Sequence, residues 1–187
     1  IVIGQSLVIP GSGGSPSGST PHSPARATGP LARVYAPAGG SPRWPAQLRA
    51  HPDRLALRAV FRHWAGVYGV PAGLLEATAW MESGWQQSVV SSTGAIGIGQ
   101  IEPYTATFIS RDVIGLSTTL DIHSPSANIR MSAAYLGWLL RSANGSVANA
   151  LGGYYQGLPS VLSSGPLTST RQYVATIGQL WRAFRSG

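Results

Sequence analysis

A chain of 187 residues is long enough for one domain of ordinary size, and the absence of cysteine excludes a disulfide scaffold, a thiolate zinc site and a catalytic thiol. The 13 basic residues are all arginine, against six acids, and seven of the arginines fall in residues 26–62 beside a single acid, Asp53. No run of about 18 apolar residues is present, so we predict no membrane-spanning segment.

The arginine-rich flank, residues 26–62, predicts an attraction to anionic polymers, which include cell-wall polymer, lipid head groups and nucleic acid. Nucleic acid is the weakest of these candidates because no recognised binding motif accompanies the charge. The alternative is a solvated basic segment that only aids solubility.

The N-terminal quarter of the chain is predicted to lie outside the folded domain. Residues 1–10 read IVIGQSLVIP and resemble the closing strand of a LysM peptidoglycan-binding module, although a chance apolar decapeptide is the alternative. They lack the basic start of a signal peptide, so we expect a trimmed or mature product. Residues 11–45 are rich in Gly, Ser, Pro and Ala, which predicts a disordered, flexible linker before a domain at residues 46–187.

Two helices are expected at the start of that domain. Apolar residues recur at helical spacing over residues 55–68, and Gly69 then ends the helix. Pro71 opens a second helix at a first-turn position, and Ser83 with Gly84 ends it.

One carboxylate lies on the apolar face of this second helix. Leu75, Ala79 and Glu82 fall at positions i, i+4 and i+7, so they share that face. Burial should raise the pKa of Glu82, as a general acid near neutral pH requires. Glu76 is expected not to share this setting because it points away from Glu82. The alternative for Glu82 is a helix-end carboxylate that reaches water or pairs with an arginine.

A glycine-rich turn follows at residues 93–101, TGAIGIGQI. Its three glycines allow the backbone to approach a ligand or Glu82 closely, and Gln100 offers both a donor and an acceptor. The turn does not fit a phosphate-binding loop because no GK[ST] is present and no strand precedes it.

The rest of the chain is predicted to be mainly helical, because strand signals are few. Asn128 falls in the first turn of one of these helices, where its amide either caps the helix or reaches a groove. The predicted elements are a short helix at 103–109, a loop at 111–124, a helix from Ser124-Pro125 to about Arg141, a short helix at 147–151 leading into 152–157, a loop at 158–167 and a last helix at 169–184.

The glutamate, the glycine-rich turn and three downstream segments form one ordered pattern. The segments are Glu82-Ser83-Gly84 with Gly94–Gln100, Asn128-Ile129 with Tyr135-Leu136, Ala150–Gly157, and Thr170–Val174. Over about residues 54–183 this pattern resembles the catalytic domain of the soluble lytic transglycosylases (SLT), glycoside hydrolase family 23 of the lysozyme superfamily. The resemblance implies a lysozyme-like helical domain with a Gly-rich active-site loop.

The resemblance also implies roles for named residues. Glu82 would be the single catalytic acid and base, and Tyr173 would orient it, while Ser83 would hydrogen-bond either Glu82 or the sugar. No metal or organic cofactor is implied. The substrate-binding residues that the resemblance implies are Ser83, Gln100, Asn128, Tyr154 and Tyr173.

The implied reaction cleaves the MurNAc-β-1,4-GlcNAc bond of peptidoglycan and forms a 1,6-anhydroMurNAc end without consuming water. Hydrolysis normally needs a second carboxylate about 5 to 9.5 Å from the first, and no sequence spacing ties another acid to Glu82. One alternative is a hydrolytic muramidase that uses Asp112 or Asp121 as the second acid. The others are a non-catalytic glycan-binding module and a packaging or tail protein that carries this domain.

Three residues depart from the family pattern. Gly99 stands where the family usually has Met, which is expected to widen the floor of the groove, and Ser132 stands where Gly is usual. Tyr155 replaces the usual Asn and so removes an amide near the saccharide. The expected partners are peptidoglycan glycan strands, with anionic cell-wall polymers at the flank 26–62, and the expected location is secreted or cell-wall associated.

Overall fold

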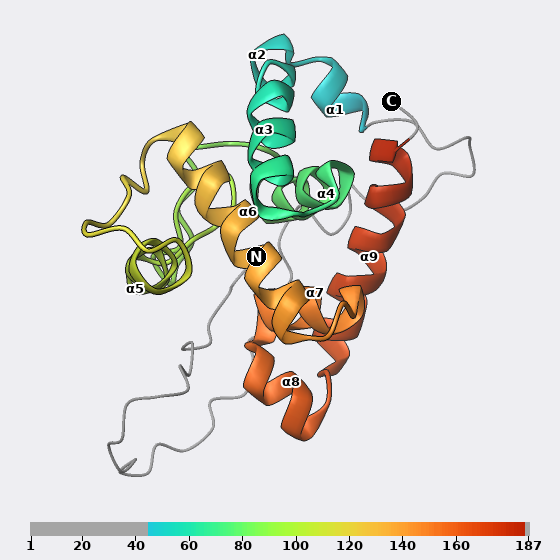
Figure 1. Ribbon diagram of the computed structural model, residues 1–187. Helices are drawn as coiled ribbons and strands as arrows, with labels where there is room; N and C mark the ends of the chain where they lie inside the picture. The colour runs from blue at the N-terminus through green and yellow to red at the C-terminus, as the bar shows by residue number, and fades with distance from the viewer. Residues whose placement is uncertain (1–44, 186–187) are drawn as a thin grey trace.

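The computed structural model describes residues 45–185, and this part of the chain is mainly helical, with a long non-helical connection at residues 84–102 (Figure 1). The LysM-like segment 1–10 and residues 11–44 of the predicted linker lie outside the described residues. Over residues 45–185 the β pairing consists of isolated antiparallel bridges that join Val90 to Ile96 and Ile96 to Ile101. The predicted mainly α fold is therefore confirmed. None of the described helices is long and apolar enough to cross a membrane.

The helices follow one another along the chain, with one π-helical segment between the fifth and the sixth. Their bounds are α1 Ala46–Arg49, α2 Pro52–Leu55, α3 Arg58–Tyr68, α4 Ala72–Ser83, α5 Pro103–Phe108, the π-helix η2 Ile109–Val113, α6 Pro125–Ser142, α7 Val147–Gln156, α8 Leu158–Ser164 and α9 Thr168–Arg185.

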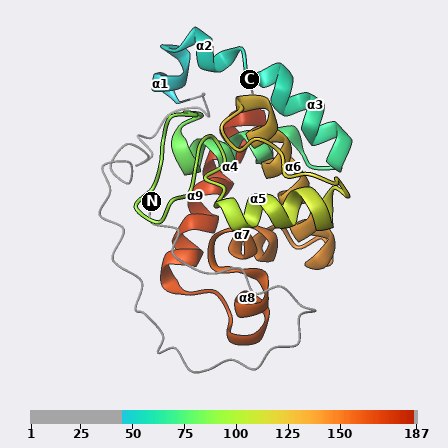
Figure 2. The same cartoon turned by 90° about the vertical axis from the view of Figure 1, so that its left-hand side faces the viewer.

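Helix α4 lies at the centre of the domain and carries the buried acid. Nine of its twelve residues are buried, which is typical of a helix that is surrounded by other elements. Helix α4 packs against α3, α6 and α9, so its partners come from both ends of the domain (Figures 1 and 2).

Three predicted boundaries in the C-terminal half are wrong. Helix α7 continues through Gly152 and Gly153 to Gln156, and α8 occupies most of the predicted loop 158–167. The glycines serve close packing there: a β-carbon on Gly153 would lie 2.9 Å from Leu139 Cδ2. Because glycine has no β-carbon, it lets α7 approach its neighbours closely. The loop predicted at 111–124 also begins inside the π-helix η2.

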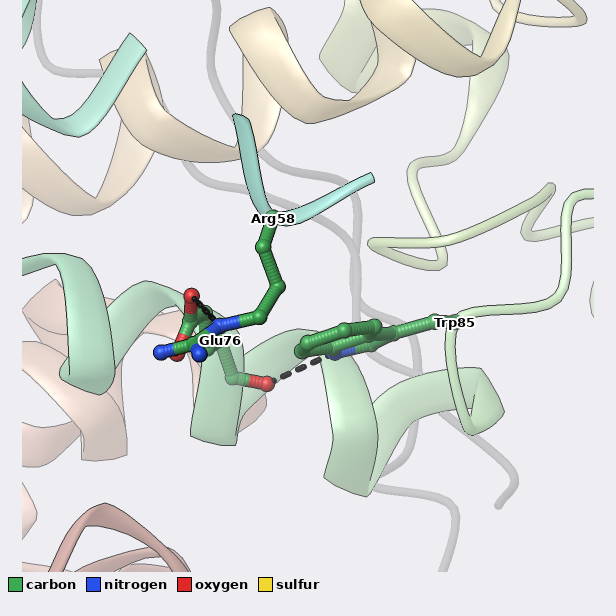
Figure 3. Close-up of polar contacts among 3 residues, drawn as sticks. All are labelled: Arg58, Glu76 and Trp85. Carbon is green, nitrogen blue, oxygen red and sulfur yellow. Dashed lines mark hydrogen bonds and ion pairs between the residues drawn. The ribbon is translucent and has the colours of Figure 1, made fainter. Parts of the chain in front are cut away.

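A buried ion pair joins α3 to α4. Arg58 Nε donates to Glu76 Oε1 at 3.0 Å, and Trp85 Nε1 donates to the backbone oxygen of Glu76 at 2.9 Å (Figure 3). Glu76 is only 1% exposed, so the expectation that it does not share the buried setting of Glu82 is wrong. Burial raises its pKa, and the hydrogen bond and charge of Arg58 oppose that rise. One helix thus holds two buried carboxylates, of which the first has an arginine partner.

Candidate active site

Glu82 lies in the last turn of α4 and is 1% exposed. The helix stops directly after Ser83, where Gly84 adopts a left-handed conformation with φ of 65° and donates its N–H to Trp80 O at 2.9 Å. Desolvation raises the pKa of Glu82 from 4.5 to about 8, although a hydrogen bond from Tyr173 acts in the opposite direction. A carboxyl group with a pKa raised to this extent can hold a proton near neutral pH, as a general acid requires.

The two carboxyl oxygens of Glu82 have different surroundings. Oε1 accepts a short hydrogen bond from the Tyr173 hydroxyl, which α9 supplies. Oε2 is buried and has no hydrogen-bond partner among residues 45–185. Burying such an atom without a partner costs about 1–3 kcal/mol. An acid with one oxygen fixed and the other uncommitted can transfer a proton to or from a group brought against Oε2.

Ser83 ties the end of α4 to the glycine-rich turn. Its hydroxyl donates to Ile98 O at 2.9 Å and accepts from the backbone N–H of Gln86 at 3.0 Å. Of the two contacts that the family resemblance implied for Ser83, the structure gives no hydrogen bond to Glu82. The residue instead places the turn against the helix end that carries the acid.

The three other polar residues that the sequence singled out all bind the backbone of this turn. Asn128 Oδ1 accepts from Gly99 N at 2.8 Å, and the Tyr154 hydroxyl donates to Gly99 O at 2.9 Å. Gln100 Nε2 donates to Gly97 O at 3.0 Å and to Val89 O at 3.1 Å. These contacts bring the predicted substrate-binding residues to one loop. A direct contact with sugar stays a prediction.

Backbone strain occurs at both edges of the site. Trp85 and Gln100 have positive φ angles of 61° and 49°, which residues other than glycine rarely adopt. Such strain persists where surrounding structure fixes it, and it concentrates at functional sites. The Trp85 ring, which is buried against Phe61 and Phe184, supplies that fixation. Trp85 was missed from the sequence, although a bulky aromatic directly after a helix-stopping glycine is a usable signal.

The space that a side chain at position 99 would enter is already occupied, although Gly99 is expected to leave it open. A β-carbon on Gly99 would lie 1.8 Å from Ser132 Oγ and 3.1 Å from the Tyr154 hydroxyl. The Ser132 hydroxyl, which donates to Asn128 O at 2.9 Å, already fills that space. The two departures from the family pattern are therefore in contact, and the side chain at one position compensates for its absence at the other.

We expect Gly99→Ala to lower the free energy of unfolding by about 1–3 kcal/mol, because the added methyl group overpacks this contact. Adding Ser132→Gly should recover part of the loss, with a coupling of about 1 kcal/mol or more in a double-mutant cycle. Urea denaturation of the wild type, the two single variants and the double variant measures this coupling. Gly178→Ala is the matched control, since no atom lies within 4 Å of its added β-carbon, and its effect should add to that of Ser132→Gly. Additive effects at positions 99 and 132 would contradict the contact.

The other acids of the described chain differ from Glu82 in environment. Asp112 and Asp121, the candidate second acids of a hydrolase, are exposed, and Glu76 is paired with Arg58. Residues 45–185 contain no group of three His, Asp or Glu side chains that could hold a metal ion. Glu82 is thus the one carboxylate in this range that is buried without an arginine.

A sequence profile described as the transglycosylase SLT domain matches residues 59–173. Two curated relatives, each named endo-type membrane-bound lytic murein transglycosylase A and both from Klebsiella pneumoniae strains, are 37% identical over 75 residues. The match covers 37% of this chain and 36% of each relative, so the chain spans about a third of their length.

Solved structures of lytic transglycosylases share the fold. The X-ray structure of an inactive mutant of Slt from Pseudomonas aeruginosa, in which a glutamate is replaced by glutamine, is 28% identical with a TM-score of 0.62. The match covers 68% of this chain and 23% of the Slt chain. The 70-kDa soluble lytic transglycosylase of Escherichia coli is 24% identical with a TM-score of 0.62. This match covers 68% of this chain and 24% of the chain of that enzyme. A complex of the 70-kDa soluble lytic transglycosylase with bulgecin A is also 24% identical, with a TM-score of 0.65. This match covers 71% of this chain and 24% of the chain in that complex. The matches at 24% identity show the fold alone.

Proposed function

The chain belongs to the transglycosylase SLT domain family, and we propose that it is a peptidoglycan lytic transglycosylase in which Glu82 is the single acid and base. It cleaves the MurNAc-β-1,4-GlcNAc bond and leaves a 1,6-anhydroMurNAc end. The observation that carries this proposal is the buried Glu82, whose Oε1 accepts a hydrogen bond from Tyr173 and whose Oε2 has no partner among residues 45–185. Desolvation also raises its pKa to about 8.

The reaction needs one proton donor that becomes a proton acceptor. Glu82 Oε2 gives its proton to the glycosidic oxygen, and the bond between that oxygen and C1 of MurNAc breaks. The acetamido group of the same sugar stabilises the positive charge at C1, a substrate-assisted exception to the use of two carboxylates. The Glu82 carboxylate then removes the proton from the C6 hydroxyl, whose oxygen bonds to C1. Glu82 ends as the protonated acid with which it began.

The remaining site residues act by position. Tyr173 orients the carboxyl through its hydrogen bond to Oε1. Asn128, Gln100 and Tyr154 set the path of the glycine-rich turn, and Ser83 joins that turn to α4, so the turn presents its backbone groups to the acetamido group and hydroxyls of the glycan. Direct contacts of these side chains with sugar, which the family pattern implies, stay a prediction, because the structure engages their polar atoms with backbone groups.

The partner that we propose is the peptidoglycan glycan strand, which places the protein outside the cytoplasm, secreted or at the cell wall. In the described part of the arginine-rich flank, Arg58 binds Glu76 and Arg54 binds Gly84 O and Gln86 Oε1. The arginines that we propose to contact anionic cell-wall polymers are therefore others of the flank, such as the exposed Arg49 and Arg62.

Two alternatives make different predictions at the same site. A hydrolytic muramidase needs a second carboxylate to activate water or form a covalent intermediate, and the exposed Asp112 and Asp121 are the candidates. A glycan-binding module needs no proton donor, and the cost of the uncommitted Oε2 argues against it.

Mass spectrometry of the products from purified peptidoglycan distinguishes the three. We expect the protein to release muropeptides lighter than the hydrolytic products by the mass of one water, and Glu82→Gln to release none. Reducing-end products that disappear in Asp112→Asn or Asp121→Asn would support the hydrolase. Binding to peptidoglycan without release of any product would support the binding module.

A further inference from the structure

Tyr155 of α7 packs on Tyr173, the tyrosine of α9 that donates a hydrogen bond to Glu82. Tyr154 and Tyr155 are adjacent, so their side chains point in different directions from the helix. Tyr154 is buried toward α6 and the glycine-rich turn. Tyr155 is only partly buried and stacks on Tyr173 of α9, with ring centroids 4.7 Å apart and an interplanar angle of 27°.

These contacts form a continuous series from the protein surface to the carboxyl group. Tyr155 is at the surface end, Tyr173 is 3% exposed, and its hydroxyl donates to Oε1 of Glu82. Stacked aromatic rings prefer a defined offset geometry, and such pairs are more favourable than the area that they bury alone would give. The ring of Tyr155 therefore limits the orientations open to Tyr173.

We propose that Tyr155 is a positioning residue for the reaction: its ring holds Tyr173 in the orientation that fixes Glu82 Oε1 and leaves Oε2 for the substrate, and it keeps water from the pair. This inference rests on the proposed function. It assigns a role to residue 155, where this chain has tyrosine in place of the asparagine of the family pattern. It also predicts that the aromatic ring, and not the hydroxyl group, is what the site requires at residue 155.

A role in positioning has a consequence for pH dependence. The titratable groups that face Glu82 are Tyr173 from α9 and Tyr154 from α7, with Tyr155 acting on Tyr173 and Tyr135 of α6 acting on Tyr154. Desolvation is the main cause of the raised pKa of Glu82. Removing the Tyr155 ring admits water, so the pKa of Glu82 should fall and the alkaline limit of activity should move to lower pH.

The test compares Tyr155→Ala and Tyr155→Phe with the wild type, using steady-state cleavage of glycan strands as a function of pH. We expect kcat of Tyr155→Ala to fall about 10- to 100-fold with little change in KM, because the acid is misaligned. Its alkaline limb should move down by about one pH unit. Tyr155→Phe should stay within about threefold of the wild type with an unchanged limb.

Tyr68→Ala is the matched control. Tyr68 is also a partly buried tyrosine stacked on an aromatic ring, that of Trp64 at 6.1 Å and 26°, but it lies on α3 and contacts neither Tyr173 nor Glu82. Its loss should lower thermal stability in a similar way while leaving the pH limb in place.

The outcomes separate this inference from the proposed function. An unshifted pH limb in Tyr155→Ala, or a change confined to KM or to thermal stability, would overturn the positioning role while the proposed function stands. Loss of kcat in Tyr155→Phe equal to that in Tyr155→Ala would also overturn it, because the hydroxyl would then be the required group. Absence of cleavage by the wild type would overturn the proposed function itself and the catalytic role of Tyr155 with it.

Discussion

Glu82→Gln should abolish catalysis and, at alkaline pH, produce a more stable protein than the wild type. General acid–base groups contribute about 10²- to 10⁴-fold to the rate, and glutamine can neither give nor take the proton. The stability gain has a separate origin. In the wild type, folding at high pH buries an ionised carboxylate without an arginine, whereas glutamine is neutral at every pH and its oxygen still accepts from Tyr173.

The sign of the pH effect follows from the two pKa values of Glu82. The folded state has a pKa of about 8, against 4.5 for the unconstrained group, so the folded state binds its proton more tightly. The contribution of Glu82 to stability is therefore greatest below pH 4.5 and is lost as the pH rises from 4.5 through 8. Each pKa unit corresponds to about 1.4 kcal/mol, so the total fall is on the order of 5 kcal/mol.

Urea denaturation of wild type and Glu82→Gln at a series of pH values between 4 and 9 measures this difference. Glu76 and Glu102 also have raised pKa values, but both are present in the two proteins and their contributions cancel in the comparison. Asp112→Asn, which removes an exposed carboxyl, controls for the loss of one acid. A difference between wild type and Glu82→Gln that does not change with pH would mean that Glu82 is ionised in the folded state at neutral pH.

The sequence was informative about the acid because one helix was enough to predict its burial. The 3.6-residue spacing of Leu75, Ala79 and Glu82 identified an apolar face, and the structure confirms that Glu82 is buried there. The start of α6 was also predicted correctly, since Ser124 caps it and Pro125 occupies its first position. In both cases the signal depends on neighbours within about two turns of helix.

The errors arise where residues far apart in the sequence meet. The prediction that Glu76 does not share the buried setting of Glu82 is wrong, because its partner, Arg58, lies on another helix. Gly99 was expected to leave space, but Ser132 of α6 fills it. The hydrogen bonds of Asn128, Gln100 and Tyr154 to the glycine-rich turn likewise depend on how three segments pack, and no spacing along the chain indicates their partners.

Removing the guanidinium group of Arg58 is expected to be among the most destabilising substitutions outside the core. Glu76 is 1% exposed, and Arg58 binds both of its carboxyl oxygens, at 3.0 and 3.4 Å (Figure 3). Arg58→Met keeps much of the side-chain volume but leaves a buried carboxylate without its arginine, which costs about 3–5 kcal/mol. The loss reaches the active site because α4 carries both Glu76 and Glu82, and Trp85 is anchored on Glu76 O.

The double variant Arg58→Met/Glu76→Met should recover most of that stability, since a buried ion pair can be replaced by apolar side chains of similar size at little cost. Arg62→Met is the matched control, because Arg62 is an exposed arginine on the same helix whose charge acts on Glu76 more weakly than that of Arg58, and it should cost less than about 1 kcal/mol. Urea denaturation at pH 5 and pH 8 adds a second criterion. Without Arg58 the pKa of Glu76 rises further, so the penalty of the single variant should be smaller at pH 5 than at pH 8. A small penalty that is equal at both pH values would mean that Glu76 is already neutral in the wild type and that packing, not charge, joins α3 to α4.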